Sequence, residues 1–302
     1  MLSKFLLVFL LSLPIIFFSA CSRSNSQPEM SRSDLDIQIR ETPEQEELNP
    51  ADLFSVHFID VGEGDAILLV QGNYAMLVDG GLAEKGTTVF SYLRNHGVEQ
   101  LEYMVATHPF ADHVGGLPDV LQRMNVRNVL LPMIYHDTPA YNAFLFAVEN
   151  SGAKVAVPFA GETFTLGKAD VTVLSPTPTD EWENRANYSI ILRVEFGSTS
   201  FLLSGDAMRE VESILLDSTV HLSSDVLKVS RHGTSSASTS GFLDAVNPSI
   251  AVISAGEENS FLSNDVLLRL ASSGTHVFRT DINGSIVITS DGTTLGVVVE
   301  RQ

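Results

Sequence analysis

A short run of metal-binding side chains constrains the fold of this chain more than any other feature. His108, Asp112 and His113 fall within six residues, directly after an apolar run at 103–106 that predicts a buried strand. Paired glycines follow at once. Because catalytic side chains usually stand on loops that a rigid scaffold positions, the pattern predicts a strand that ends in a metal-binding loop.

Polarity patterns along residues 51–302 alternate between those of strands and those of helices. The first half opens with alternating runs at 53–59, 66–70 and 74–78, whose glycine-containing turns predict antiparallel pairing. Further strands are predicted at 102–106, 128–131, 154–157, 164–166, 171–174, 189–196, 200–203, 226–229, 250–253, 277–278, 285–288 and 296–299. Helices are predicted at 87–95, 117–124, 141–150, 208–216, 241–246 and 265–271.

The second half of this region repeats the organisation of the first. A hairpin predicted at 189–203 again precedes alternating helices and strands, and no linker-like composition separates the halves. The pattern therefore predicts one internally duplicated α/β (α+β) domain over residues 51–302, with two facing sheets and helices outside them.

The charge balance limits the partners of the chain. Its 302 residues include 18 Lys and Arg against 37 Asp and Glu, a formal net charge of -19. We expect no strong nucleic-acid groove, because phosphate binding needs clustered basic residues. The acidity also favours solubility, and it leaves room for a metal ion, which brings its own positive charge.

The N-terminal segment predicts export and anchoring. Residues 1–20 have a positive charge near the start, an apolar core and small residues before Cys21, as in a secretory signal peptide. The ending Phe18-Ser19-Ala20-Cys21 resembles a bacterial lipobox, so we expect lipidated Cys21 to hold the chain in a lipid bilayer, on the extracytoplasmic face of a membrane of the bacterial cell envelope. An uncleaved N-terminal anchor is the alternative. Residues 21–50 are polar and acidic and predict a disordered tether. Cys21 is the single cysteine, which excludes an internal disulfide framework and a cysteine-based zinc cluster.

Candidate metal ligands follow three predicted strands. They are His108, Asp112 and His113 in the first loop, Asp206 in the second and His232 in the third. Histidine nitrogen and aspartate oxygen hold divalent ions such as Zn²⁺ or Mn²⁺. Taken alone, Asp206 would be read as a helix N-cap and a lone histidine as a surface residue, so the prediction rests on their joint occurrence.

Several motifs together resemble one known family. The segment His108-Pro109-Phe110-Ala111-Asp112-His113 resembles the His-x-His-x-Asp-His motif of the metallo-β-lactamase superfamily, and above all the hydrolase-like domain of ComEC-type DNA-uptake (competence) proteins and its stand-alone lipoprotein relatives. Supporting segments lie, in order, at 58–66, 78–81, 187–189, 203–207, 225–229 and 279–281. The resemblance covers roughly residues 53 to 290 and implies a four-layer αββα sandwich with the site at the sheet edges.

The resemblance also implies the roles of individual residues. Asp206 and a hydroxide would bridge two metal ions; one ion would take His108 and residue 110, and the other Asp112, His113 and His232. The hydroxide would attack an ester or phosphoester, which makes Asp112 and Asp206 the predicted catalytic residues. Asp60, Asp79 and Asn187 would orient the ligands, although Asp60 and Asp79 are equally suited to forming turns beside glycine.

Three positions depart from the family pattern. Phe110 replaces the second histidine of the motif, and Arg231 stands where relatives usually have a histidine before His232. The segment Leu262-Ser263-Asn264 lacks the histidine of the family's Gly-His-Pro. Because the ligands of the other ion are intact, we expect one bound ion rather than two.

Two functions remain open on the sequence alone. The first is a membrane-anchored, metal-dependent hydrolase of the phosphodiesterase or nuclease-like kind, acting on a small phosphoester or nucleic-acid-derived substrate. The second is a non-catalytic lipoprotein that keeps the fold and binds a ligand or partner.

Overall fold

The computed structural model describes residues 52–256 and 261–301. The predicted signal peptide, tether and lipidated Cys21 lie outside these residues. Within them, every helix is too short or too polar to cross a bilayer.

The first sheet combines an antiparallel and a parallel half. Its strand order is β15-β14-β1-β2-β3-β4-β5-β6. The antiparallel strands are β15 (Leu295–Val299), β14 (Ile286–Ser290), β1 (Phe54–Phe58), β2 (Ile67–Gln71) and β3 (Tyr74–Val78). The strands that continue parallel to β3 are β4 (Gln100–Val105), β5 (Asn125–Leu130) and β6 (Lys154–Ala156).

The second sheet has the same construction. Its order is β13-β12-β11-β10-β9-β8-β7. The antiparallel strands are β7 (Thr163–Leu166), β8 (Ala169–Ser175), β9 (Ile191–Phe196) and β10 (Thr199–Leu203). The strands that continue parallel to β10 are β11 (Val226–Lys228), β12 (Ile250–Ile253) and β13 (His276–Arg279).

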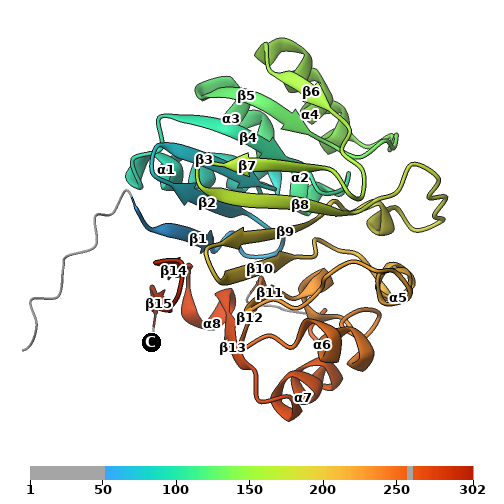
Figure 1. Ribbon diagram of the computed structural model, residues 1–302. Coiled ribbons are helices and arrows are strands. Elements are labelled where there is room, and N and C mark those ends of the chain that lie inside the picture. The colour runs from blue at the N-terminus through green and yellow to red at the C-terminus, as the bar shows by residue number, and fades with distance from the viewer. Residues whose placement is uncertain (1–51, 257–260, 302) are drawn as a thin grey trace, which may run out of the picture. The chain divides into compact units, whose positions relative to one another are not determined.

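This topology confirms the predicted duplication. The order β14-β1-β2-β3-β4-β5-β6 matches β7-β8-β9-β10-β11-β12-β13 in both direction and position. The match requires β14, from the end of the chain, to lie beside β1 at its beginning, as Figure 1 shows by the red strand next to the blue one.

Helices connect the parallel strands of both sheets (Figure 1). Those of the first half are α1 (Gly86–Asn95), α2 (Ala111–Val114), α3 (Leu117–Arg123) and α4 (Pro139–Ser151), with the 3-10 turn η2 (Ala83–Lys85). Those of the second half are α5 (Arg209–Asp217), α6 (Ser240–Val246), α7 (Asn264–Ser272) and α8 (Thr280–Asn283), with the 3-10 turns η3 (Arg185–Tyr188) and η4 (Ser230–Gly233).

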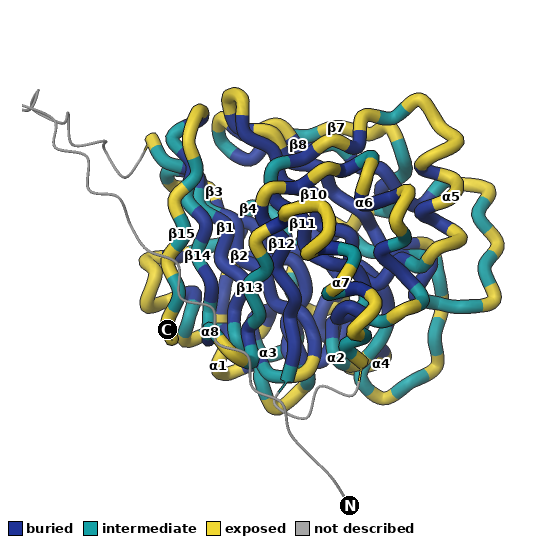
Figure 2. The backbone as a smooth tube through the Cα atoms, turned by 90° about the horizontal axis from the view of Figure 1, so that it is seen from below, coloured by how far each residue is buried: buried dark blue, intermediate teal, exposed yellow. Residues whose placement is uncertain are grey.

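Side-chain alternation along the strands builds three apolar layers. In β2, Ile67 and Leu69 point into the core between the sheets, whereas Leu68 points to the core under the helices of the first half. In β10, Phe201 and Leu203 enter the same central core, and Leu202 faces the helices of the second half. The buried strands of both sheets run through the centre in Figure 2, with exposed residues concentrated on the outer helices and loops. This is the αββα sandwich that the sequence predicts.

The two sheets bring the carboxyl ends of β3, β4, β10 and β11 into one region, which is where the predicted polar loops begin. A close backbone contact joins the turn between β1 and β2 to the loop after β4. The Asp65 amide donates to the Asp112 carbonyl at 3.1 Å, and a side chain at Gly64 would place its Cβ 2.0 Å from that same oxygen. Gly64 also has a φ of 110°, so this approach requires glycine.

Candidate metal centre

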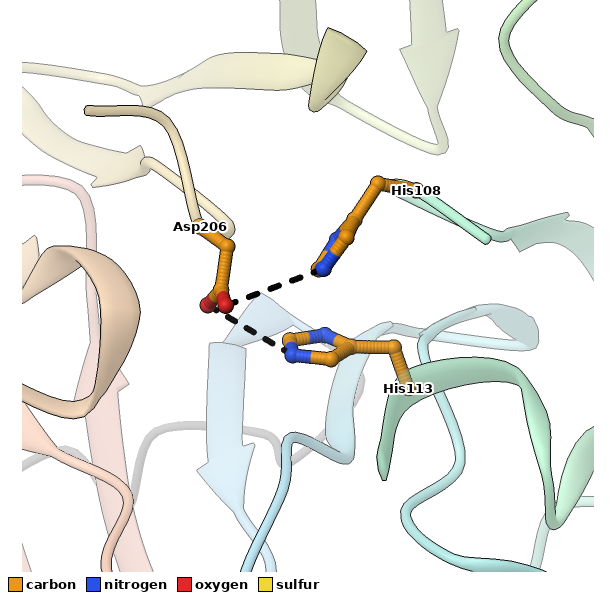
Figure 3. A group of neighbouring side chains, drawn as sticks. All are labelled: His108, His113 and Asp206. Carbon is orange, nitrogen blue, oxygen red and sulfur yellow. Dashed lines mark ion pairs between the residues drawn. The ribbon is translucent and has the colours of Figure 1, made fainter. Parts of the chain in front are cut away.

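The three predicted loops meet at a single point. His108 and His113 follow β4, Asp206 follows β10, and all three are buried. Their side chains converge in Figure 3: His108 Nε2 lies 3.7 Å from Asp206 Oδ2, and His113 Nε2 lies 3.5 Å from Asp206 Oδ1.

A second group of ligands adjoins the first. Asp112 Oδ2 lies 3.7 Å from His113 Nε2 and 3.5 Å from Nε2 of His232, which follows β11. His232 Nε2 in turn lies 3.7 Å from Asp206 Oδ1. His113 therefore belongs to both groups, Asp206 adjoins the second through His232, and the structure brings together all five residues that the sequence predicts as ligands.

The atoms that face this point fit a divalent cation. His108 Nε2, His113 Nε2, His232 Nε2 and Asp206 Oδ1 are buried without a hydrogen-bond partner. Four unpaired polar atoms in one place would be expensive, because each loses its hydration. Ligands bonded to one tetrahedral zinc at about 2.1 Å are themselves about 3.4 Å apart, close to the separations found here.

A one-turn helix explains how two adjacent residues can serve one site. Asp112 and His113 lie in α2, which Phe110 caps, so their side chains leave the helix about 100° apart. His113 is buried, while the Asp112 side chain is 24% exposed. Gly116 allows α2 to reach the turn after β3, since a Cβ there would lie 2.1 Å from the Gly80 carbonyl oxygen.

Asp79 holds His113 as the resemblance implies. Its carboxylate accepts from the Thr107 amide at 2.8 Å and from the Thr107 hydroxyl at 2.7 Å, and lies 2.8 Å from His113 Nδ1. An Nδ1–H donated to Asp79 leaves the Nε2 lone pair directed at the site. Asp79 has a φ of 59°, in the left-handed region that aspartate tolerates better than most residues.

Backbone carbonyls and hydroxyls orient the other two histidines. His232 Nδ1 lies 3.1 Å from the Ser254 carbonyl oxygen, which can only accept, so Nδ1 carries the proton and Nε2 is free to bind. His108 Nδ1 lies 3.0 Å from the Thr107 hydroxyl. All three Nε2 atoms are thereby presented as ligands.

Asp65 lies close to two candidate ligands, although the sequence did not single it out. It is 1% exposed and pairs at 2.7 Å with Lys228 Nζ, whose residue is fully buried. Asp65 Oδ1 lies 3.8 Å from His232 Nδ1, and Oδ2 lies 3.9 Å from His113 Nδ1. This carboxylate thus lies behind two ligands from different loops. Its sequence signal was a lysine within the apolar strand β11.

Within the described part of the chain, Asp60 and Asn187 form their hydrogen bonds with residues other than the candidate ligands. The Asp60 carboxylate accepts from the Gly62 amide and pairs with Arg301 at 2.7 Å, so its contacts among the described residues are those of a turn and a surface ion pair. Asn187 Oδ1 accepts from the amide of Met208 at 2.9 Å. Since Met208 caps α5, Asn187 fixes the loop that carries Asp206 rather than a ligand itself.

Burial and charge set the pKa of each ligand. Burial, together with His113, lowers the pKa of His108 to about 3. Burial opposes ionisation of Asp206, but the charges of His113 and His232 outweigh it and hold its pKa well below the usual value. Burial also opposes a charge on His113, yet Asp206 and Asp79 raise its pKa well above the usual value. The carboxylates of the site therefore attract positive charge, which a divalent ion can supply.

Asp112 and His232 follow the same pattern. Burial disfavours the Asp112 carboxylate, but contact with His232 and the charge of His113 lower its pKa to about 2. Burial disfavours a charged His232, and Asp206 and Asp112 raise its pKa nonetheless. Behind the ligands, burial raises the pKa of Asp79.

Two of the three departures from the motif, Phe110 and Arg231, line a cleft beside the ligands. The Phe110 ring lies 4.9 Å from the His108 ring and 5.7 Å from that of His136, measured between centroids. Ser263 caps α7 and Asn264 begins it, so this segment supplies a helix start. The cleft beside the ligands has a volume of about 390 Å³ and is lined by Glu63, Leu82, Phe110, Ala111, Asp112, Asp206, Arg231, His232 and Phe261.

A family model decides what this arrangement represents. The model of the metallo-beta-lactamase superfamily matches residues 59–257, a stretch that includes every predicted ligand. The chain belongs to the metallo-beta-lactamase superfamily. Its histidine and aspartate clusters accord with the divalent ions that this fold generally binds.

Curated relatives in the superfamily include competence proteins. ComE operon protein 3 of Bacillus subtilis (strain 168) is 28% identical over 253 residues, covering 76% of this chain and 32% of that protein. Competence protein ComA of Neisseria gonorrhoeae is 28% identical over 231 residues, covering 75% of this chain and 31% of that protein. The chain therefore spans about a third of the length of these relatives.

Two solved structures share the fold of this chain. The metallo-beta-lactamase fold protein YhfI from Bacillus subtilis matches with a TM-score of 0.54 and 13% identity, over 78% of this chain and 100% of that one. CmlA, a diiron beta-hydroxylase from Streptomyces venezuelae, matches with a TM-score of 0.52 and 15% identity, over 75% of this chain and 52% of that one. At these identities the likeness establishes the fold alone.

Proposed function

We propose that this protein is a metal-dependent hydrolase of phosphoesters or esters that works with one divalent ion, Zn²⁺ or Mn²⁺. The observation that carries the proposal is the convergence of buried, unpartnered nitrogen and oxygen atoms from three loops. Asp112, His113, Asp206 and His232 would hold the ion, and His108 adjoins them through Asp206.

The bound ion would polarise an ester oxygen and increase the acidity of a nearby water. The chain's own residues do the rest. The Asp79 carboxylate and the Ser254 carbonyl keep the rings of His113 and His232 in place. Asp112 is the ligand with the most exposed side chain at the cleft, and its low pKa keeps it ionised, so it can orient a water by accepting a hydrogen bond from it.

The number of ions follows from Phe110. A second ion beside His108 would have His108 and Asp206 but no ligand at position 110, where an apolar ring stands. An apolar ring cannot bind a metal ion, which supports one ion. The part of the site beside His108 is therefore the degenerate part.

Turnover is tested with the full chain and bis-p-nitrophenyl phosphate, in buffer with added Zn²⁺ or Mn²⁺ and in buffer with a chelator. We expect metal-dependent release of p-nitrophenol by the wild type, and none by Asp206→Asn. Equal rates with and without metal, or in both proteins, would contradict hydrolysis at this site.

A non-catalytic binding lipoprotein is the second candidate, favoured by Phe110 and Arg231 at positions that hold histidine in the family pattern. Tight metal binding without turnover of phosphodiesters or carboxylic esters would favour it over the hydrolase.

We further propose that Cys21 anchors the protein in a lipid bilayer on the extracytoplasmic face of an envelope membrane, where its substrate would be a small phosphoester or nucleic-acid-derived molecule. The lipobox-like ending at Cys21 supports the anchor. Detergent phase partitioning tests it: the wild type should enter the detergent phase and Cys21→Ser with residues 1–20 removed should not.

A further inference from the structure

Arg231 lines the cleft, and its guanidinium contacts no oxygen atom of the described residues. Its Nη1 atom lies 3.0 Å from the sulfur of Met208, which is a weak acceptor. The other arginines that the structure describes each form an ion pair with a carboxylate or a hydrogen bond to a carbonyl oxygen, as Arg127 pairs with Glu102 at 3.3 Å. Within residues 52–256 and 261–301, Arg231 is the arginine whose guanidinium has no oxygen partner.

The backbone of Arg231 and its neighbour is strained at the cleft. Arg231 has φ 48° and ψ 50°, and the next residue, His232, has φ 53° and ψ 23°. Two consecutive left-handed residues without a glycine are unfavourable, and such strain collects at functional sites. The same turn that directs His232 to the metal centre therefore directs Arg231 to the cleft that adjoins it.

Part of the cleft wall is apolar and aromatic. Phe110 and Leu82 are half-buried there, and Phe261 is 43% exposed. Its volume of about 390 Å³ suits a small molecule, since ligand pockets are typically about 300–1,000 Å³. The cleft thus offers one cation and aromatic surfaces, directly beside the metal ligands.

The chemistry of an arginine separates the two ester classes. A guanidinium pairs with two oxygens of a phosphate or carboxylate. A carboxylic ester is neutral before hydrolysis and gives Arg231 no charge to bind, whereas a phosphodiester is an anion throughout. We propose that Arg231 binds the phosphoryl oxygens of a small phosphodiester substrate, whose flat apolar group lies against Phe110 and Phe261. This inference rests on the proposed hydrolase function and narrows its substrate class.

The charges of the cleft make this binding depend on the ion. Glu63, Asp112 and Asp206 outnumber Arg231 among its lining residues, so the cleft repels anions until a divalent cation is bound. Phosphate affinity should therefore require both the metal and Arg231.

Calorimetric titration of the full chain with phenyl phosphate, in Mn²⁺, tests the proposal; this monoester is the product that hydrolysis of a phenyl phosphodiester would leave at Arg231. Arg231→Asn removes the charge with a residue that tolerates the left-handed region. We expect it to retain its metal content and to bind phenyl phosphate about ten- to a hundredfold more weakly, with partial recovery in Arg231→Lys. Arg127→Asn, which removes an equal charge outside the cleft lining, should bind as the wild type does.

A second pair of titrations isolates the aromatic wall. Phe261→Ala should lower the affinity for phenyl phosphate several-fold and leave the affinity for inorganic phosphate unchanged, because in the proposal only the phenyl ring of the ligand contacts Phe261. Unchanged phenyl phosphate affinity in Arg231→Asn, or no binding by the wild type, would overturn the proposal. Binding that depends on Arg231 without any turnover would instead refute only the hydrolase function, and turnover that ignores Arg231 would refute only this inference.

Discussion

Among single residues, Phe110 is the one that we propose limits the site to one ion. Its ring contacts His108 at a centroid distance of 4.9 Å, in the position of a missing ligand. Phe110→His should therefore add about one equivalent of metal and raise phosphodiesterase activity, because a third donor joins His108 and Asp206. Elemental analysis with parallel rate measurements checks this. If both quantities stay at the wild-type level, the pocket has been rebuilt for another purpose.

Asp65 links stability to metal binding. Replacing it by asparagine leaves buried Lys228 without its counter-charge, which should destabilise the fold by about 3–5 kcal/mol. Metal affinity should also fall by roughly ten- to a hundredfold, because His113 and His232 lose an orienting group. Urea unfolding and chelator competition measure the two effects.

A double variant separates these two roles of Asp65. Asp65→Asn with Lys228→Met removes the unpaired charge, so stability should recover while metal affinity stays low. Recovery of both would show that Asp65 acts only through the stability of the fold.

His57 makes stability depend on pH outside the metal centre. Burial, with a smaller contribution from His96, lowers its pKa from 6.5 to about 4. Below pH 6.5 His57 is protonated in the unfolded chain but stays neutral in the folded protein. The free energy of unfolding therefore falls as the pH drops from about 6.5 to about 4, by at most about 3 kcal/mol. Unfolding curves of His57→Gln should show a flatter pH dependence over this window. The exposed His221→Gln is the control, and an equally steep profile in all three proteins would contradict the assignment.

At the scale of elements, the turn before β2 and the helix α2 form one unit. Gly64→Ala would force a Cβ to within 2.0 Å of the Asp112 carbonyl oxygen at a φ of 110°. We expect a loss of about 2–4 kcal/mol in the free energy of unfolding and weaker metal binding, because Asp112 must move. Gly97→Ala is a matched control, with a φ of 76° and nothing within 4 Å of its Cβ, and should cost about 1 kcal/mol. Similar losses in both variants would mean that the contact at Asp112 is unimportant.

Hydrophobic patterns in the sequence predict long helices and strands but not very short ones. The strand and helix at 74–78 and 87–95 are predicted almost to the residue, because hydrophobic periodicity over a whole element is a strong signal. α2 has four residues, too few for a period to show, yet it is the element that lets Asp112 and His113 share a site. α8 is equally short and was not predicted.

At the scale of the molecule, duplication explains both what the sequence predicts and what it leaves out. The sandwich follows from two similar series of apolar strands, and the ligands follow from polar residues at the ends of β4, β10 and β11. Asp65 could not be selected in this way, because its partner Lys228 is distant in sequence and meets it only when the two sheets face each other. Likewise, the pairing of Asp60 with Arg301 depends on the chain's last described residues returning to its first strand.

We propose that one divalent ion is held by Asp112, His113, Asp206 and His232. Elemental analysis of the full chain, loaded with Zn²⁺ or Mn²⁺ and then desalted, tests it most directly. We predict about one ion per wild-type chain and nearly none in His232→Ala or Asp206→Asn, since each variant removes one of the four ligands. Less than half an equivalent in the wild type, or equal metal in all three proteins, would contradict the account.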